Sequence, residues 1–185
     1  MRLRDTRILG LALAWLLMAG GGSAQDSQPS EYQLKAAFLF NFAKFVEWPP
    51  AAFAEPNSPL IIGILGENPF GDVLEETVRG KSLNNHPLAV RTFRSVAEST
   101  NCHVLFISAS EADRLPAILA RLKGRSILTV GDTKDFVARD GIVGFTVDHK
   151  RLKLRVNLAA ADAAKLTISS KLLRQADVVR GDANR

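Results

Sequence analysis

Short apolar segments alternate with amphipathic ones along most of the chain, and this pattern predicts strands separated by helices. The continuous apolar runs Leu60 to Leu65 and Val104 to Ile107 are typical of strands buried on both faces. Further strands are predicted at Leu88 to Phe93, Ser126 to Val130, Ile142 to Asp148 and Lys153 to Leu158. Because strands separated by helices need crossover connections, we expect an α/β fold with a mainly parallel sheet covered on both faces. The last two strands are close enough in sequence to form an antiparallel C-terminal hairpin.

The first helix is predicted from Glu31 to Glu47, a stretch that contains neither Gly nor Pro. Ser30 is available as its N-cap, and the prolines after Trp48 end it. At about 100° per residue, one stripe that we expect to face the core holds Leu34, Phe38, Phe42 and Phe45. Further helices are predicted at about Phe70 to Arg79, Glu111 to Lys123, around Phe136, and Ala159 to Asp177.

The N-terminal segment has the pattern of an export signal. Arg2, Arg4 and Arg7 precede an apolar run of 11 residues, Ile8 to Met18, whereas roughly 20 are needed to span a bilayer. Small residues follow, so we expect cleavage after Ala24, with an uncleaved anchor as the alternative. The predicted organisation is a signal peptide at 1–24, a flexible lead-in at 25–30, a single domain at 31–179 and a frayed tail at 180–185.

Composition narrows the class of protein further. The 185 residues are 46% hydrophobic and 23% charged, which is typical of a globular domain and not of a disordered chain. The net charge of +5 falls to +3 without residues 1–24, which hold three Arg and one Asp, so no nucleic-acid partner is predicted. The single cysteine excludes a disulfide within one chain.

The residues give no support for catalysis. His86, His103 and His149 form no H-x-x-H pair, and G-x-S-x-G is absent. Cys102 adjoins His103, but consecutive residues on a strand point to opposite faces, so they do not make a thiolate–imidazole pair. We therefore predict no catalytic residue, no metal site and no cofactor.

A candidate ligand pocket lies where two parallel strands end. Ligands of open parallel sheets collect at the carboxyl ends of the strands, and a glycine-rich turn there can offer N–H groups to an anion. The alternative is that the glycines only permit tight turns. The candidate residues are Gly66, Glu67, Asn68, Phe70, Gly71 and Ser108.

A candidate contact surface lies on the first helix. Phe40 projects on the same side as Lys44 and Glu47, away from the apolar stripe, and Trp48 follows in the turn. An aromatic side chain on a polar face indicates a partner or dimer contact, unless a neighbouring segment covers it. On the hairpin, Arg151, Lys153 and Arg155 share one face, which predicts a solvated strand face. The alternative is contact with an anionic partner or with membrane headgroups.

Five stretches together carry a family resemblance. They are KAAFLFNFAKFVEWP (Lys35 to Pro49), IIGILGENPFG (Ile61 to Gly71), NCHVLFIS (Asn101 to Ser108), DGIVGF (Asp140 to Phe145) and LRVNLAAADAAKLTISSKLL (Leu154 to Leu173). Their order and spacing resemble the YfiR family of periplasmic proteins, over about residues 31 to 179.

The resemblance implies a Rossmann-like three-layer α/β/α sandwich that forms a homodimer in the periplasm and acts as a regulator. In the arrangement known for the family, the protein represses an inner-membrane diguanylate cyclase, and an outer-membrane lipoprotein sequesters the repressor. Other members accompany sensor kinases or outer-membrane channels. This chain matches only one of the cysteines that form disulfides in the type member, Cys102. Redox control is thus in doubt, although an exposed Cys102 would allow an intermolecular disulfide.

Two functions follow as hypotheses. The first is a periplasmic regulatory protein that binds and inhibits or tunes an inner-membrane signalling protein, a diguanylate cyclase in the leading version. The alternative is a periplasmic small-molecule-binding protein that serves an envelope transport or sensory system through the candidate pocket. A periplasmic hydrolase ranks below both, because no nucleophile–base pair is visible.

Overall fold

The eight strands of the main sheet run in the order β10-β8-β7-β6-β5-β2-β4-β3 in the computed structural model, which describes residues 30–149 and 151–179. The strands are β2 (Leu60–Leu65), β3 (Ser82–Leu83), β4 (His86–Phe93), β5 (Val104–Ile107), β6 (Leu128–Gly131), β7 (Val143–Asp148), β8 (Arg151–Asn157) and β10 (Ala176–Val179). The five central strands are parallel, which confirms the predicted α/β class. The predictions for 1–24, for 25–29 and for 180–185 lie outside the described residues.

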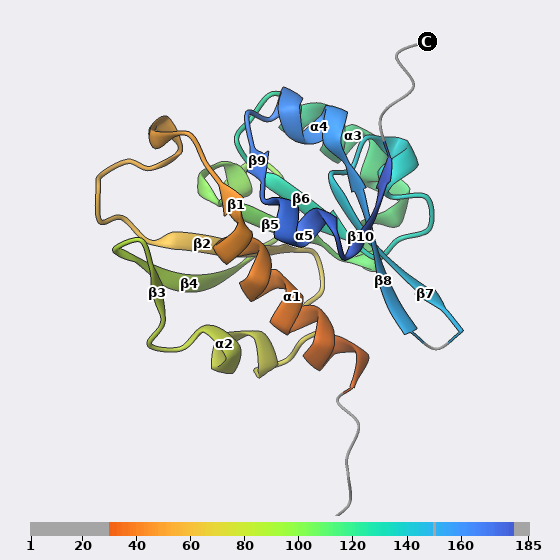
Figure 1. The fold of residues 1–185 in the computed structure, drawn as a ribbon, viewed down its shortest axis with the longest axis horizontal. Coiled ribbons are helices and arrows are strands. Elements are labelled where there is room, and N and C mark those ends of the chain that lie inside the picture. Colours follow the sequence, from red (N-terminus) through yellow and green to blue (C-terminus); the bar gives the residue numbers. More distant parts are fainter. Residues whose placement is uncertain (1–29, 150, 180–185) are drawn as a thin grey trace, which may run out of the picture.

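Helices cover both faces of this sheet (Figure 1). One face packs against α1 (Glu31–Phe45), α2 (Val73–Val78), α4 (Leu158–Ala163) and α5 (Ser170–Leu173), and the other against α3 (Leu115–Leu122). Four short 3₁₀ helices lie at Pro50–Ala52, Glu98–Asn101, Ala109–Arg114 and Val137–Arg139. Two separate apolar clusters, one on each side of the sheet, give the predicted three layers.

The segment after β8 differs from the prediction. The continuous helix expected from Ala159 to Asp177 is wrong, because the chain forms α4, β9 (Thr167–Ile168), α5 and β10 in turn. β9 pairs with β1 (Val46–Glu47), and β10 pairs with β8 in parallel. These long-range pairings override the helical preference of an Ala- and Leu-rich segment. The antiparallel hairpin of β7 and β8 is confirmed, but β10 and not the hairpin forms the edge of the sheet.

Helix α1 begins as predicted and ends two residues earlier. Ser30 and Gln33 cap it reciprocally, because the Gln33 N–H donates to Ser30 Oγ at 3.2 Å and the Ser30 N–H donates to Gln33 Oε1 at 2.6 Å. It ends at Phe45 because Val46 pairs with Ile168.

The buried face of α1 is rotated from the predicted stripe. Of the four predicted residues only Phe42 is buried, and Leu34 is 38% exposed. The buried face is instead Lys35, Ala36, Leu39, Phe42 and Ala43. Alanines at two of these positions leave space for the larger aromatic rings at the borders of the face. Among the described residues, no helix has the length and apolar character needed to cross a membrane.

Candidate functional site

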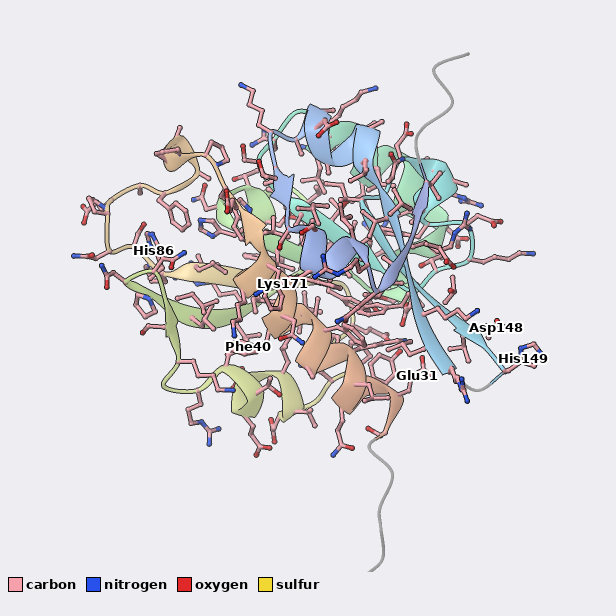
Figure 2. The ribbon with its side chains drawn as sticks, viewed as in Figure 1. Glu31, Phe40, His86, Asp148, His149 and Lys171 are labelled. Carbon is pink, nitrogen blue, oxygen red and sulfur yellow. The ribbon has the colours of Figure 1, made fainter. Side chains whose placement is uncertain are left out.

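The predicted contact residues lie along the second half of α1 and the turn after it. Lys44 and Glu47 are exposed, whereas Phe40 and Trp48 are half-buried. The Lys81 ammonium lies 4.4 Å from the centre of the Phe40 ring, so a neighbouring segment partly covers this aromatic side chain. Figure 2 shows Phe40 on the side of α1 that faces α2. Lys44 and Glu47 are therefore the accessible residues of this surface.

An aromatic stack anchors the turn at Trp48. The Phe53 ring lies between two imidazoles, with centroid distances of 3.9 Å to His86 and 4.4 Å to His103. The Trp48 Nε1–H donates to the His103 carbonyl oxygen at 3.2 Å. The Ile61 N–H donates to His103 Nδ1 at 3.1 Å, which requires a ring that is unprotonated at that nitrogen. Burial is the main cause that lowers the pKa of His103 to about 4.

Cys102 and His103 contact different surroundings, in line with the prediction that they form no pair. The Cys102 thiol is 4% exposed and donates to the Ser99 carbonyl oxygen at 2.9 Å. Burial raises the pKa of this thiol to about 12. An intermolecular disulfide needs an exposed thiol, whereas the Cys102 thiol is buried and protonated.

Hydrogen bonds within the protein occupy several polar groups in the loops of the predicted ligand pocket. The Phe70 N–H donates to Asn68 Oδ1 at 2.9 Å, and the Asn68 amide donates to the Gly71 carbonyl oxygen at 3.1 Å. The Glu67 N–H donates to Ser110 Oγ at 3.0 Å, and Ser108 caps the 3₁₀ helix that follows it. The Phe70 ring is buried against Tyr32 and Phe106. These bonds use the polar groups that a ligand would need, which fits the alternative of tight turns.

A buried lysine links α1 to the carboxyl edge of the sheet, and sequence reasoning missed it. Lys35 is 2% exposed, and its ammonium lies 2.5 Å from Glu31 Oε1 and 2.5 Å from Asp132 Oδ2. The same ammonium lies 4.4 Å from the centre of the Tyr32 ring. Burial lowers the pKa of Lys35, but hydrogen bonds to Asp132 and Glu31 outweigh it and raise the pKa above its ordinary value. Lys35 is therefore a cation at neutral pH, and its ion pair with Asp132 holds α1 to the loop after β6.

A cavity of about 440 Å³ opens beside Lys35, between the start of α1, the loop after β6 and the hairpin. Asp132 Oδ1 and Thr133 Oγ1 are buried there without a hydrogen-bond partner among the described residues. Burial and the Asp132 carboxylate raise the pKa of the Tyr32 phenol, whose hydroxyl donates to Asp132 at 3.3 Å. The sequence signal that could have found this cluster is a lysine within a run of buried helix positions, together with an aspartate directly after a buried strand.

The mostly parallel sheet between helical layers places this chain among the α/β proteins. Within that class the chain belongs to the YfiR/HmsC-like family (DUF4154), whose profile matches residues 32–177. Proteins of this family are periplasmic regulators, and it is not a known enzyme family. The match confirms the resemblance carried by the five sequence stretches.

One solved structure that is similar to this chain supports the fold. A conserved domain protein from Vibrio cholerae O1 biovar El Tor matches with a TM-score of 0.54 and 14% identity, over 83% of this chain and 62% of that chain. The ABC domain in complex with L-Trp from Streptococcus pneumoniae matches with a TM-score of 0.47 and 12% identity, over 64% of this chain and 55% of that chain. This chain thus spans less than two thirds of either structure. No curated protein matches it.

Proposed function

We propose that this chain is a periplasmic regulatory protein that binds an inner-membrane signalling protein, a diguanylate cyclase, and inhibits or tunes it. The observation that carries the proposal is the family match over residues 32–177, which spans α1 and nearly the whole sheet. The proposal includes export with cleavage after Ala24 and action by contact rather than by catalysis.

The proposed contact surface is the exposed side of α1 with the Trp48 turn. Lys44 and Glu47 are exposed, and neither forms an ion pair with another described residue. Both charges are therefore available for complementary charges on a partner. The Phe40 ring and the Trp48 indole flank them as half-buried apolar area.

Regulation would follow if this chain bound two conformations of the partner with different affinities. If the α1 surface binds the inactive conformation of the partner's periplasmic domain more tightly, the equilibrium shifts toward that conformation. The Lys35 ion pairs hold the first half of α1, and the pairing of Val46 with Ile168 holds the chain directly after it, so little conformational freedom is lost on binding.

Co-purification tests this contact. The tagged protein, isolated from envelope fractions, should retain an inner-membrane signalling protein, and Lys44→Glu or Glu47→Lys should each reduce the retained amount severalfold. Arg121→Glu is the matched control, because Arg121 is an exposed charge on α3, on the other face of the sheet. If both α1 variants retained as much of the signalling protein as the Arg121→Glu control, the contact would lie outside the α1 surface.

The family resemblance also motivates a homodimer and release by an outer-membrane lipoprotein. Sedimentation of the purified protein should give twice the monomer mass, and a lipoprotein that shares the α1 surface should displace the signalling protein. A monomer at every concentration tested would remove the dimer from the proposal.

The second candidate function, small-molecule binding for an envelope transport or sensory system, is favoured by the 440 Å³ cavity beside Lys35. Asp132 and Thr133 line it, and each has a buried oxygen with no hydrogen-bond partner among the described residues, a feature that calls for an explanation such as a ligand or water. A thermal-shift screen with nucleotides, amino acids and vitamins tests it, because a ligand specific for the folded state raises the melting temperature. No shift with any compound would favour regulation by protein contact alone.

A further inference from the structure

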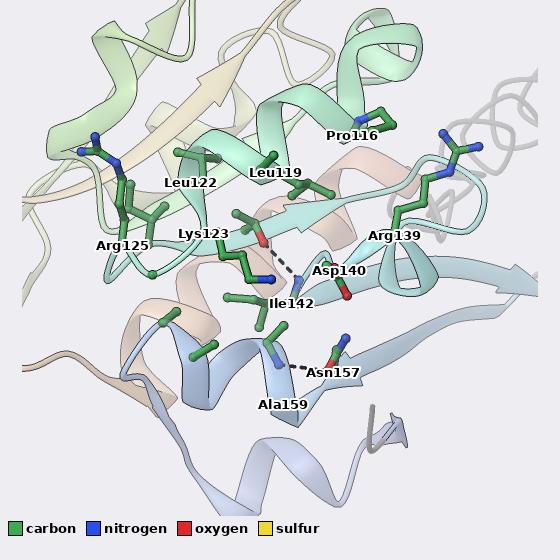
Figure 3. Close-up of a pocket in the computed structure, with 17 residues that line it drawn as sticks. Pro116, Leu119, Leu122, Lys123, Arg125, Arg139, Asp140, Ile142, Asn157 and Ala159 are labelled. Atoms are coloured by element: carbon green, nitrogen blue, oxygen red, sulfur yellow. Dashed lines mark hydrogen bonds between the residues drawn. The ribbon is translucent and has the colours of Figure 1, made fainter. Parts of the chain in front are cut away.

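We propose that a groove between α3 and α4 binds a small amphipathic anion, an aliphatic chain that ends in one carboxylate. The α3–α4 groove lies at the edge of the sheet where β6 and β7 begin, away from the loops in which the sequence placed a pocket (Figure 3). Its lining includes Leu119, Leu122, Ile127, Ile142, Ala160 and Ala164. The inference goes beyond the proposed regulatory contact and does not depend on it.

The size of the groove fits a small ligand. Its volume is about 690 Å³, within the range of roughly 300 to 1,000 Å³ that is usual for ligand sites. The space exists because α4 and its C-cap residue present alanine at four lining positions, namely Ala159, Ala160, Ala163 and Ala164. A larger side chain at any of them would occupy the groove.

The floor of the groove is aliphatic. Leu119, Leu122, Ile127 and Ile142 are each at most 7% exposed, so they form a fixed apolar surface. None of the residues that line the groove is Phe, Tyr or Trp. Without an aromatic side chain on which a ring could stack, the floor favours an alkyl chain over a nucleobase or an indole.

Two polar side chains on the floor of the groove, Asn157 and Thr129, have hydrogen-bond donors available for a ligand. Asn157 is 6% exposed, and its Oδ1 accepts from the Ala160 N–H at 3.0 Å, which leaves the amide NH₂ without a partner among the described residues. Figure 3 shows the amide end of Asn157 directed toward Asp140. Thr129 Oγ1 accepts from the Ile142 N–H at 3.0 Å, and its hydroxyl hydrogen has no acceptor within residues 30–149 and 151–179. Both donors suit an acceptor such as a carboxylate oxygen.

The charged side chains on the rim of the groove favour a negatively charged ligand. Lys123, Arg125 and Arg139 are exposed around the groove with a single carboxylate, Asp140. None of the four forms an ion pair with another described residue. Figure 3 shows Arg125 and Arg139 at opposite ends, with Lys123 extending between them. Three cations against one anion favour an anionic head group and disfavour a cationic one.

Calorimetric titration with decanoate, kept below its micelle concentration, tests the proposal. We expect saturable binding of decanoate, at least tenfold weaker binding of decan-1-ol, and no binding of decyltrimethylammonium. Vesicles of an anionic phospholipid form a separate arm, since they distinguish a lipid head group from a free fatty acid. Binding to vesicles without binding to decanoate, or equal binding of decanoate and decan-1-ol, would overturn the proposal.

Two kinds of variant locate the site. Ala160→Leu should fill the groove and abolish binding of decanoate. The paired substitution Lys123→Gln with Arg139→Gln should weaken the binding of decanoate about fivefold and leave the binding of decan-1-ol unchanged. Arg121→Gln, an exposed charge on α3 outside the groove, should bind like the wild type. The rim residues are exposed, so the paired variant keeps the test decisive if Ala160→Leu fails to fold. Unchanged decanoate binding by the paired variant would contradict the proposal.

Discussion

At the scale of single residues, the least expected feature is a lysine in the core. Lys35 lies on the buried face of α1, and at 2% exposure it is nearly as buried as Leu39 and Phe42 on the same face. A buried charge is tolerated only when it is paired, and Glu31 and Asp132 provide that pairing from one helix and one loop. Helix and sheet are therefore joined by an interaction that is specific in geometry as well as in charge.

Removal of the Lys35 charge should destabilise the fold. In Lys35→Met the Asp132 carboxylate stays nearly buried without a counter-ion, and the free energy of unfolding should fall by about 3 kcal/mol. Urea denaturation measures this loss. The double variant Lys35→Met with Asp132→Asn should recover part of it, because no charge is then left unpaired. A single variant as stable as the wild type would show that the ion pair contributes nothing.

The pKa of His103 predicts acid sensitivity. It is about 4 in the folded protein, where burial favours the neutral ring, against roughly 6.5 in an unfolded chain. Between these values the unfolded state binds more protons, so stability should decline as pH falls from about 6.5 to 4, by at most about 3 kcal/mol. Chemical denaturation across this pH range measures the slope. His103→Asn, which keeps an acceptor for the Ile61 N–H, should reduce it, whereas an unchanged slope would assign it to other groups.

At the scale of elements, burial on both faces decided which strands the sequence predicted well. β2 and β5 match the predicted bounds because every position of these strands is buried, which gives an unbroken apolar run. The prediction of a C-terminal helix failed because β9 and β10 pair with strands that lie outside this segment, β1 and β8 respectively. Periodicity within a segment contains no information about such partners.

Close packing of the short helix at Val137–Arg139 gives a prediction at this scale. A Cβ at Gly141 would overlap the Phe136 ring and lie 2.7 Å from the Phe136 carbonyl oxygen. Gly141→Ala should therefore cost about 2 kcal/mol of stability, measured by urea denaturation. Gly80→Ala, where a Cβ meets no atom within 4 Å but φ is +69°, should cost about 1 kcal/mol from backbone strain alone. A Gly141 variant less affected than the Gly80 variant would contradict the packing argument.

At the scale of the whole molecule, candidate sites occur on separate parts of the surface. The α1 surface and the Lys35 cavity lie on the α1 side and carboxyl edge of the sheet, and the α3–α4 groove lies at the opposite edge. The sequence indicated the charged residues of α1 but neither cavity. Lys35 and Asp132 are 97 positions apart, and the groove combines residues from 116 to 164, so only the fold brings each set together.

Regulation of a membrane cyclase by protein contact is the central proposal for this protein, and the cellular cyclic di-GMP concentration is its sharpest test. A strain that lacks this gene should show raised cyclic di-GMP, wild-type protein and the Arg121→Glu control should restore the lower concentration, and Glu47→Lys should not. A deletion strain with an unchanged cyclic di-GMP concentration would contradict the account.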